Sequence, residues 1–314
     1  LKGWQVAFMA VGIPGMLLAL LTWQIKEPPR GLSEGLISSE SKNPLNETFK
    51  ELVGLTPFGL VGSDNFKKEL SINIIFTVLI FLASYYLYVL TGDFLQWTAF
   101  GIGVYVICNW IHGLKNRDPV AFLLIFKSKA LLLGLLSFPF ITFVTYALGA
   151  FGPSFYIRNF SMTATEVGII YGLITVFGSM IGVICGGILG DKLRETYVNG
   201  KLYLIMASAV LTGVTAIGFI HSENLVASFT WKFVYHIAST AWLGCAASTV
   251  TELVLPRLRA VASAFFILML SMIGLALGPY LTGMVSDIYI NSGLLPGPAL
   301  KNAMTLTLVV LVLP

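Results

Sequence analysis

The sequence predicts an all-α protein, a polytopic transmembrane helical bundle. Hydrophobic residues make up 56% of the 314 residues and charged residues only 11%, whereas soluble domains carry roughly 25% charged residues. The apolar residues are gathered into nine long stretches, and a helix needs roughly 20 of them to cross the hydrocarbon core. Lys and Arg concentrate in every second gap between these stretches. The surface of the protein is therefore expected to face lipid.

The nine apolar stretches give the expected helices in chain order. They run approximately over residues 5–25, 72–91, 95–113, 130–151, 166–190, 202–221, 228–254, 259–287 and 301–314. The chain opens at Leu1 rather than Met, and the ninth stretch is still apolar at Pro314. We therefore expect an internal piece of a longer protein, with its last helix truncated.

The distribution of basic residues predicts the side of the membrane on which each loop lies. Cytoplasmic loops retain Lys and Arg, so the cytoplasmic loops are expected at residues 26–71, 114–129, 191–201 and 255–259. Loop 26–71 is rich in Ser, Glu, Lys and Pro, which favours a flexible linker, and residues 45–54 favour one short amphipathic helix. Only about three residues separate the second and third stretches, which predicts a tight helical hairpin.

Several classes of function have no support in the sequence. Cys108, Cys185 and Cys245 each lie within an apolar stretch without a partner at metal-ligand spacing, so we interpret them as packing residues. No metal site, no cofactor motif and no catalytic motif is recognised, and catalytic residues are expected to be none. The basic residues are not pooled into a patch that would bind nucleic acid.

Glycines are regularly spaced in the fifth stretch. Gly178, Gly182 and Gly186 recur at every fourth residue, which places them on one helix face and allows a neighbouring backbone to approach closely. Structural packing is one interpretation. The other is a helix that slides or rocks against its neighbour during a transport cycle.

A charged motif ends the fifth stretch on the expected cytoplasmic side and reads Gly187-Ile188-Leu189-Gly190-Asp191-Lys192-Leu193-Arg194. An acid at this place can neutralise a facing helix N-terminus, and the bases can bind anionic groups. Such a latch can hold one conformation and release it; ordinary basic flanking of a membrane span is the alternative. The candidate cytoplasmic gate consists of Gly187, Asp191, Lys192, Arg194, Arg257 and Arg259.

At this motif the chain resembles the major facilitator superfamily. Members of that family carry a Gly-x-x-x-Asp-Arg/Lys-x-Gly-Arg-type loop between their second and third helices, with a weaker copy between the eighth and ninth. Gly187, Asp191 and Lys192 match, whereas Arg194 or Glu195 replaces the later Gly. Two further segments resemble spinster-like members: Gly3-Trp4-Gln5 with Lys26-Glu27-Pro28-Pro29-Arg30-Gly31, and Pro256-Arg257-Leu258-Arg259-Ala260-Val261-Ala262-Ser263-Ala264 with Gly274, Gly278-Pro279 and Gly283.

This resemblance implies a domain organisation. The last helix of an N-terminal half corresponds to residues 1–25, a cytoplasmic linker to 26–71, an inserted transmembrane hairpin to 72–113, a cytoplasmic loop to 114–129 and a C-terminal six-helix half to 130–314. The remainder of the N-terminal half is an expected partner from the same chain. The hairpin departs from the twelve-helix pattern, and we expect it to be a lipid-facing packing element.

Polar residues within the stretches are the candidates for a substrate cavity, because ionisable and polar groups inside a membrane are costly. His236 can exchange a proton near neutral pH or can be a hydrogen-bonded interface residue. Glu252 either pairs with Arg257 or Arg259 in an inner gate or takes part in proton coupling. Ser and Thr also bond back to their own helix. The cavity candidates are Thr142, Thr145, Tyr146, Tyr171, Thr175, Ser179, His236 and Thr240, and the coupling candidates are His236 and Glu252.

The leading hypothesis is a secondary active transporter that works by alternating access in the plasma membrane or the bacterial inner membrane. The resemblance implies a small organic or amphipathic solute, whose identity is unknown, and proton coupling rests on the two candidate residues. The bilayer and the solute are the expected partners. One alternative is a polytopic membrane enzyme acting on lipids, which needs acid, base or metal ligands at one depth. Another is a receptor or scaffold with the same fold.

Overall fold

A computed structural model describes residues 3–26, 44–57 and 66–314. The chain divides into two compact units, residues 1–48 and 49–314. The first contains α1 (Gly3–Trp23), an apolar helix with Pro14 in its interior. Helix α2 (Pro44–Gly54) forms where the sequence predicts a short amphipathic helix. The other parts of the expected linker, residues 27–43 and 58–65, lie outside the described residues.

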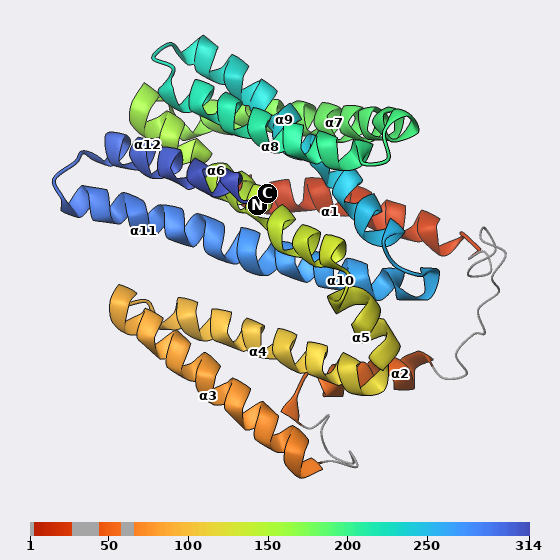
Figure 1. Cartoon of the computed structure of the whole chain (residues 1–314). Coiled ribbons are helices and arrows are strands. Elements are labelled where there is room, and N and C mark those ends of the chain that lie inside the picture. The colour runs from red at the N-terminus through yellow and green to blue at the C-terminus, as the bar shows by residue number, and fades with distance from the viewer. Residues whose placement is uncertain (1–2, 27–43, 58–65) are drawn as a thin grey trace. The chain divides into compact units, whose positions relative to one another are not determined.

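The second unit is built from helices. Its elements are α3 (Phe66–Thr91), α4 (Phe94–Arg117), α5 (Pro119–Phe126), α6 (Lys129–Phe160), α7 (Ala164–Thr196), α8 (Gly200–His221), α9 (Leu225–Glu252), η3 (Pro256–Leu258), α10 (Arg259–Met269), the π-helical η4 (Leu270–Leu277), α11 (Gly278–Asn291), α12 (Pro296–Thr307) and η5 (Leu308–Val312). Figure 1 shows α6 to α12 gathered into one bundle, with α3 and α4 as a separate hairpin beside α10 and α11. The predicted all-α bundle is confirmed.

Six helical runs in the described residues are long and apolar enough to cross a membrane: α3, α4, α6, α7, α8 and the run from Arg259 to Asn291. Two other predicted spans appear as the shorter apolar helices Phe8–Trp23 and Pro296–Val312. Helix α9 is long enough, with 28 residues, but it is less apolar because it carries Lys232, His236 and many Ser and Thr residues. Its polar composition matches its position, because α9 packs against both α7 and α8 and shows less of its surface to lipid.

Glycines set the distance between α7 and α9. A Cβ atom on Gly182 would overlap the Ile237 carbonyl oxygen, and one on Gly186 would overlap the Ala241 carbonyl oxygen. Gly190 lies against the Cys245 Sγ atom. Glycine is therefore required where the two backbones approach, as the four-residue spacing predicts. Gly187 does not belong to this four-residue series, and a Cβ atom added there would meet open space.

Helix α6 crosses the π-helical segment between α10 and α11. Gly274 lies against Thr142, and Gly278 lies against the backbone of Phe143. Pro279 follows directly and has no N–H to continue the hydrogen-bond ladder, which explains why the regular α-helix is interrupted here. The α3–α4 hairpin approaches the same run, since Trp110 of α4 stacks on Phe265 with ring centroids 5.5 Å apart.

The expected loop 114–129 contains a helix of its own. Asp118 caps α5 by accepting a hydrogen bond from Ala121 N at 2.9 Å, and Pro119 occupies the first helical turn. Ala121 and Ile125 are buried, so α5 adds to the core formed around α6 and α10. The hydropathy pattern does not separate such a short helix from a loop.

Candidate functional site

An ion-pair cluster lies at the expected cytoplasmic end of the bundle. Lys201 Nζ donates to Glu252 Oε1 at 2.5 Å and lies 3.9 Å from Asp191 Oδ1. Arg194 approaches Glu252 Oε2 at 3.6 Å and also donates to the Val198 carbonyl oxygen at 2.9 Å. The cluster joins the ends of α7 and α9 to the start of α8. We call these four residues, Asp191, Arg194, Lys201 and Glu252, the cytoplasmic cluster.

Glu252 has partners that the sequence did not suggest. Its ion pairs among the described side chains are with Lys201 and Arg194, which belong to α8 and α7. Arg259 donates from Nε to the Thr251 carbonyl oxygen at 3.1 Å, and the side chain of Arg257 lies outside the described residues. Lys192 is exposed. Of the residues in the charged motif at the end of α7, Asp191 and Arg194 thus belong to the cytoplasmic cluster.

A hydrogen bond joins α7 to α9 nearer the middle of α9. Thr175 Oγ1 lies 3.1 Å from His236 Nε2, and the same hydroxyl donates to the Tyr171 carbonyl oxygen at 2.8 Å. Because its proton is used there, the hydroxyl is placed to accept from Nε2 in a tautomer with a hydrogen on that nitrogen. The Tyr171 ring meets the imidazole edge-to-face, with centroids 6.1 Å apart. At a rise of about 1.5 Å per residue, His236 lies about 16 Å along α9.

Lys232 lies one helical turn before His236 and is fully buried. Its Nζ lies 4.2 Å from the ring centroid of Phe219, 4.4 Å from that of Tyr235 and 5.1 Å from that of Tyr171. Among the described residues it has no hydrogen-bond partner. Three aromatic faces around an ammonium offset part of its desolvation. An unpaired buried cation remains costly, which makes Lys232 the clearest functional candidate that the sequence reading missed.

The other cavity candidates are dispersed. Thr240 Oγ1 donates to the His236 and Ser179 carbonyl oxygens at 2.7 and 3.2 Å, so the side chain of Thr240 and the backbone of Ser179 belong to the α7–α9 contact. Thr145 bonds back to Ile141, Tyr146 is 45% exposed, and buried Thr142 lies against Gly274. Tyr171, Thr175 and His236 are the candidates that the fold brings into one group.

The sequence contained a signal for Lys232. An ionisable residue within a span is a functional candidate by default, and Lys232 falls inside the stretch 228–254. A basic residue this close to the start of a span is usually a flanking charge, so the sequence alone does not single out Lys232. Lys201 was likewise interpreted as a loop residue, but it is 8% exposed. The partners of both side chains come from other helices, and hydropathy does not reveal them.

Comparisons with known proteins agree with this fold. No protein-family model matches the chain. An MFS-type efflux pump of Mycolicibacterium smegmatis is 32% identical over 149 residues, which are 47% of this chain and 34% of that relative. Protein spinster of Drosophila melanogaster is 26% identical over 173 residues, or 51% of this chain and 28% of the relative. The matched segments thus span about a third of these relatives.

Two solved structures extend the likeness to three dimensions. Both are crystal structures of a bacterial homologue of the human lysosomal transporter spinster in an inward-facing conformation. The occupied form is 24% identical, with a TM-score of 0.53 over 70% of this chain and 54% of the other. The unoccupied form is 22% identical, with the same TM-score over 70% and 56%. The chain is therefore similar to an MFS-type efflux pump and to spinster proteins over part of their length, and it shares the fold of the bacterial spinster homologue.

Proposed function

We propose that residues 129–314 form one half of a secondary transporter that moves a small organic or amphipathic solute by alternating access. Relatives named as an efflux pump and as spinster proteins support this reading over a membrane enzyme or a scaffold. Rocking of one half against the other around a central site is the usual mechanism of such folds. The chain contributes one wall of that site, and further helices supply the opposite wall.

The observation that carries the proposal is the pair of basic side chains on one face of α9. Lys232 and His236 are one turn apart and are held by residues of α7 and α8. Ionisable groups at this depth are characteristic of substrate and ion pathways. His236 accepts and releases the coupling proton in this proposal, and Thr175 orients its imidazole. Lys232 supplies a positive charge that an anionic group of the solute can pair with.

The cytoplasmic cluster is the inner latch of the same proposal. It ties α7, α8 and α9 together at one end through Lys201 and Glu252. Surface ion pairs contribute roughly 0–1 kcal/mol, so a latch of this kind can hold one conformation and still release it within a transport cycle. Glu252 is 41% exposed on its side chain, and Lys201 only 10%. Opening would therefore expose the lysine to water.

Uptake measurements on the full-length protein test this function. The protein is reconstituted in proteoliposomes and screened with organic anions, sugars and lysolipids under an imposed pH gradient. We expect saturable, gradient-driven uptake that is lost in His236→Asn and reduced in Thr175→Val. The matched control is His221→Asn, because His221 is exposed at the end of α8 and bonds to Thr305 instead.

Two results would contradict parts of the proposal. Gradient-driven uptake that persists in His236→Asn assigns the coupling proton to another residue. Absence of uptake for every solute, in a protein that elutes as a single species, favours the receptor or scaffold alternative.

A further inference from the structure

Helix α3 is polar where it is buried and apolar where it is exposed. The residues of α3 that are buried are Glu69 and Asn73, and its apolar window has no buried residue. In a membrane, polar side chains join helices because lipid offers them no partner. The inserted hairpin is therefore held together by polar contacts near the start of α3, on the expected cytoplasmic side.

A polar seam, formed by Glu69, Asn73, Tyr105, Asn109, His112 and Asn116, joins α3 to α4. The Glu69 carboxylate contacts His112 Nε2 and accepts from Asn116 Nδ2 at 2.9 Å. Asn73 Nδ2 donates to Asn109 Oδ1 at 2.5 Å, and Tyr105 OH donates to Asn73 Oδ1 at 3.1 Å. These bonds fix the separation of the two helices at this end.

The opposite end of the hairpin is closed by its turn. Gly92 adopts a φ of 81°, a left-handed conformation that favours glycine. Trp97 Nε1 donates to Thr91 Oγ1 at 2.6 Å across the same turn. Between the turn and the polar seam, Gly101 faces the Ser84 hydroxyl closely. The two helices are thus tied at both ends and are in contact near the middle.

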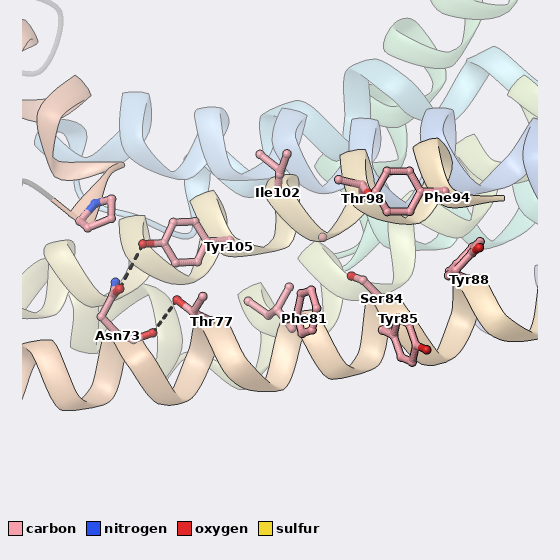
Figure 2. A pocket seen from close by; sticks show the side chains of 13 residues that line it. Asn73, Thr77, Phe81, Ser84, Tyr85, Tyr88, Phe94, Thr98, Ile102 and Tyr105 are labelled. Atoms are coloured by element: carbon pink, nitrogen blue, oxygen red, sulfur yellow. Dashed lines mark hydrogen bonds between the residues drawn. The ribbon is translucent and has the colours of Figure 1, made fainter.

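A groove of about 510 Å³ runs between α3 and α4. Figure 2 shows its lining, with Asn73 and Tyr105 at one end and Tyr88 and Phe94 at the other. Thr77 and Phe81 of α3 and Thr98 and Ile102 of α4 line the part between. Small-molecule sites of roughly 300–1,000 Å³ with apolar walls and a few polar groups are typical of bound organic ligands. This groove is apolar along its length and polar at one end.

We propose that this groove binds one acyl chain of an anionic phospholipid from the cytoplasmic leaflet. Both helices are long and apolar enough to span the bilayer, so lipid chains are the solvent that meets the groove. Exposed Lys67 and Lys68 stand at the start of α3, directly before the polar seam. Juxtamembrane lysines attract anionic headgroups. A chain in the groove thus has its headgroup beside the lysines and its tail along Thr77, Phe81 and Ile102.

Photocrosslinking of the full-length protein tests this site. The protein is placed in phosphatidylcholine vesicles that contain a minor share of phosphatidylglycerol with a diazirine in its acyl chain. After irradiation, the labelled residues are located by mass spectrometry. We expect adducts concentrated on groove residues such as Phe81 and Ile102. Adducts spread evenly over the exposed face of α3, including Leu79 and Leu82, overturn the proposal.

Neighbouring substitutions separate the groove from the general lipid surface. Thr77→Trp and Thr98→Trp place an indole in the groove from either helix, and the expected result is a several-fold loss of labelling at Ile102 and Phe81. Val78→Trp and Ala99→Trp are the matched controls, because these residues are exposed one position away and do not line the groove. Because the two groove variants are independent, the test remains valid if one of them fails to fold. Equal labelling in the groove variants and in the controls overturns the proposal.

The headgroup preference is tested by charge. In Lys67→Gln and Lys68→Gln, labelling by phosphatidylglycerol relative to a phosphatidylcholine probe is expected to fall roughly fivefold for each lysine removed. An unchanged ratio overturns the anionic part of the proposal. Absence of labelling from either probe in the unsubstituted protein overturns the whole and indicates a protein segment over the groove. None of these readouts depends on transport.

Discussion

Gln96 of α4 donates from Nε2 to the Ala276 carbonyl oxygen at 3.3 Å. Ala276 lies in the π-helical segment just before Pro279, where the backbone ladder is irregular. A backbone carbonyl inside a bilayer has no water to bond with. The α3–α4 hairpin thus supplies a hydrogen bond to the interrupted part of the α10–α11 run, and Tyr280 OH donates to Asp93 Oδ2 at 2.6 Å nearby.

This contact predicts the effect of Gln96→Leu. The substitution preserves volume and removes the donor, so we expect a loss of about 1 kcal/mol, the scale of interhelical hydrogen bonds in membranes. The thermal midpoint of the detergent-solubilised protein measures it. Leu95→Ala is the control, because Leu95 is 81% exposed on the adjacent position. A Gln96→Leu protein as stable as the control would show that the hairpin does not support the π-helical segment.

The glycine register predicts opposite results for two adjacent residues. Gly186→Ala places a methyl group against the Ala241 carbonyl, and overpacking of this kind costs about 1–3 kcal/mol. Gly187→Ala meets open space, and alanine favours a helix over glycine by up to about 1 kcal/mol. Thermal midpoints of the two variants should therefore move in opposite directions. Similar shifts in both would contradict the close approach of α7 and α9.

The cytoplasmic cluster predicts coupling between Lys201 and Glu252. In Glu252→Gln, the mostly buried Lys201 ammonium keeps Asp191, at 3.9 Å, as its remaining carboxylate partner. We expect the free energy of unfolding to fall by about 1 kcal/mol, since Glu252 itself is partly exposed. Adding Lys201→Met should recover most of it, because no cation then lacks its partner. A double-mutant cycle on thermal midpoints measures the coupling. Strictly additive effects would mean that the pair contributes nothing.

Lys232→Met should stabilise the protein. It replaces a buried cation, which lacks a hydrogen-bond partner among the described residues, by an apolar side chain of similar length, and burying an unpaired charge costs far more than burying an apolar group. The aromatic contacts are kept by the thioether. We expect a raised thermal midpoint together with loss of uptake for anionic solutes. Lys192→Met, at an exposed position, is the control, and a lowered midpoint in Lys232→Met would show that the ammonium is stabilising.

Hydropathy and charge were sufficient to predict much of the fold. The apolar stretches are long enough to locate each helix along the sequence, and the gaps between them, alternately rich and poor in basic residues, separate one stretch from the next. Helices form at all nine expected places. The four-residue spacing of Gly178, Gly182 and Gly186 predicts their close contact with a neighbour. The neighbour itself, α9, could not be identified, because a stripe of small residues carries no information on which helix it meets.

The candidate site was harder to predict for the same reason. The face of α9 that turns toward α7 depends on packing between helices, which the sequence does not show. Thr175 and His236 could therefore be named as separate candidates, but the hydrogen bond between them could not be predicted. Lys201 and Glu252 lie 51 positions apart, and nothing in either local sequence indicates the other. The Glu69–His112 contact escaped prediction because Glu69 precedes the expected span 72–91 and was interpreted as part of a loop.

The glycine contacts between α7 and α9 limit how these two helices can move against each other. A shift of α7 along α9 by less than one glycine period, about 6 Å, would move side chains other than glycine toward the Ile237 and Ala241 carbonyl oxygens. We therefore expect the two helices to resist sliding past each other and to move together. We expect deformation instead in the run from Arg259 to Asn291, where the π-helical turns of η4 interrupt the regular α-helical hydrogen-bond ladder.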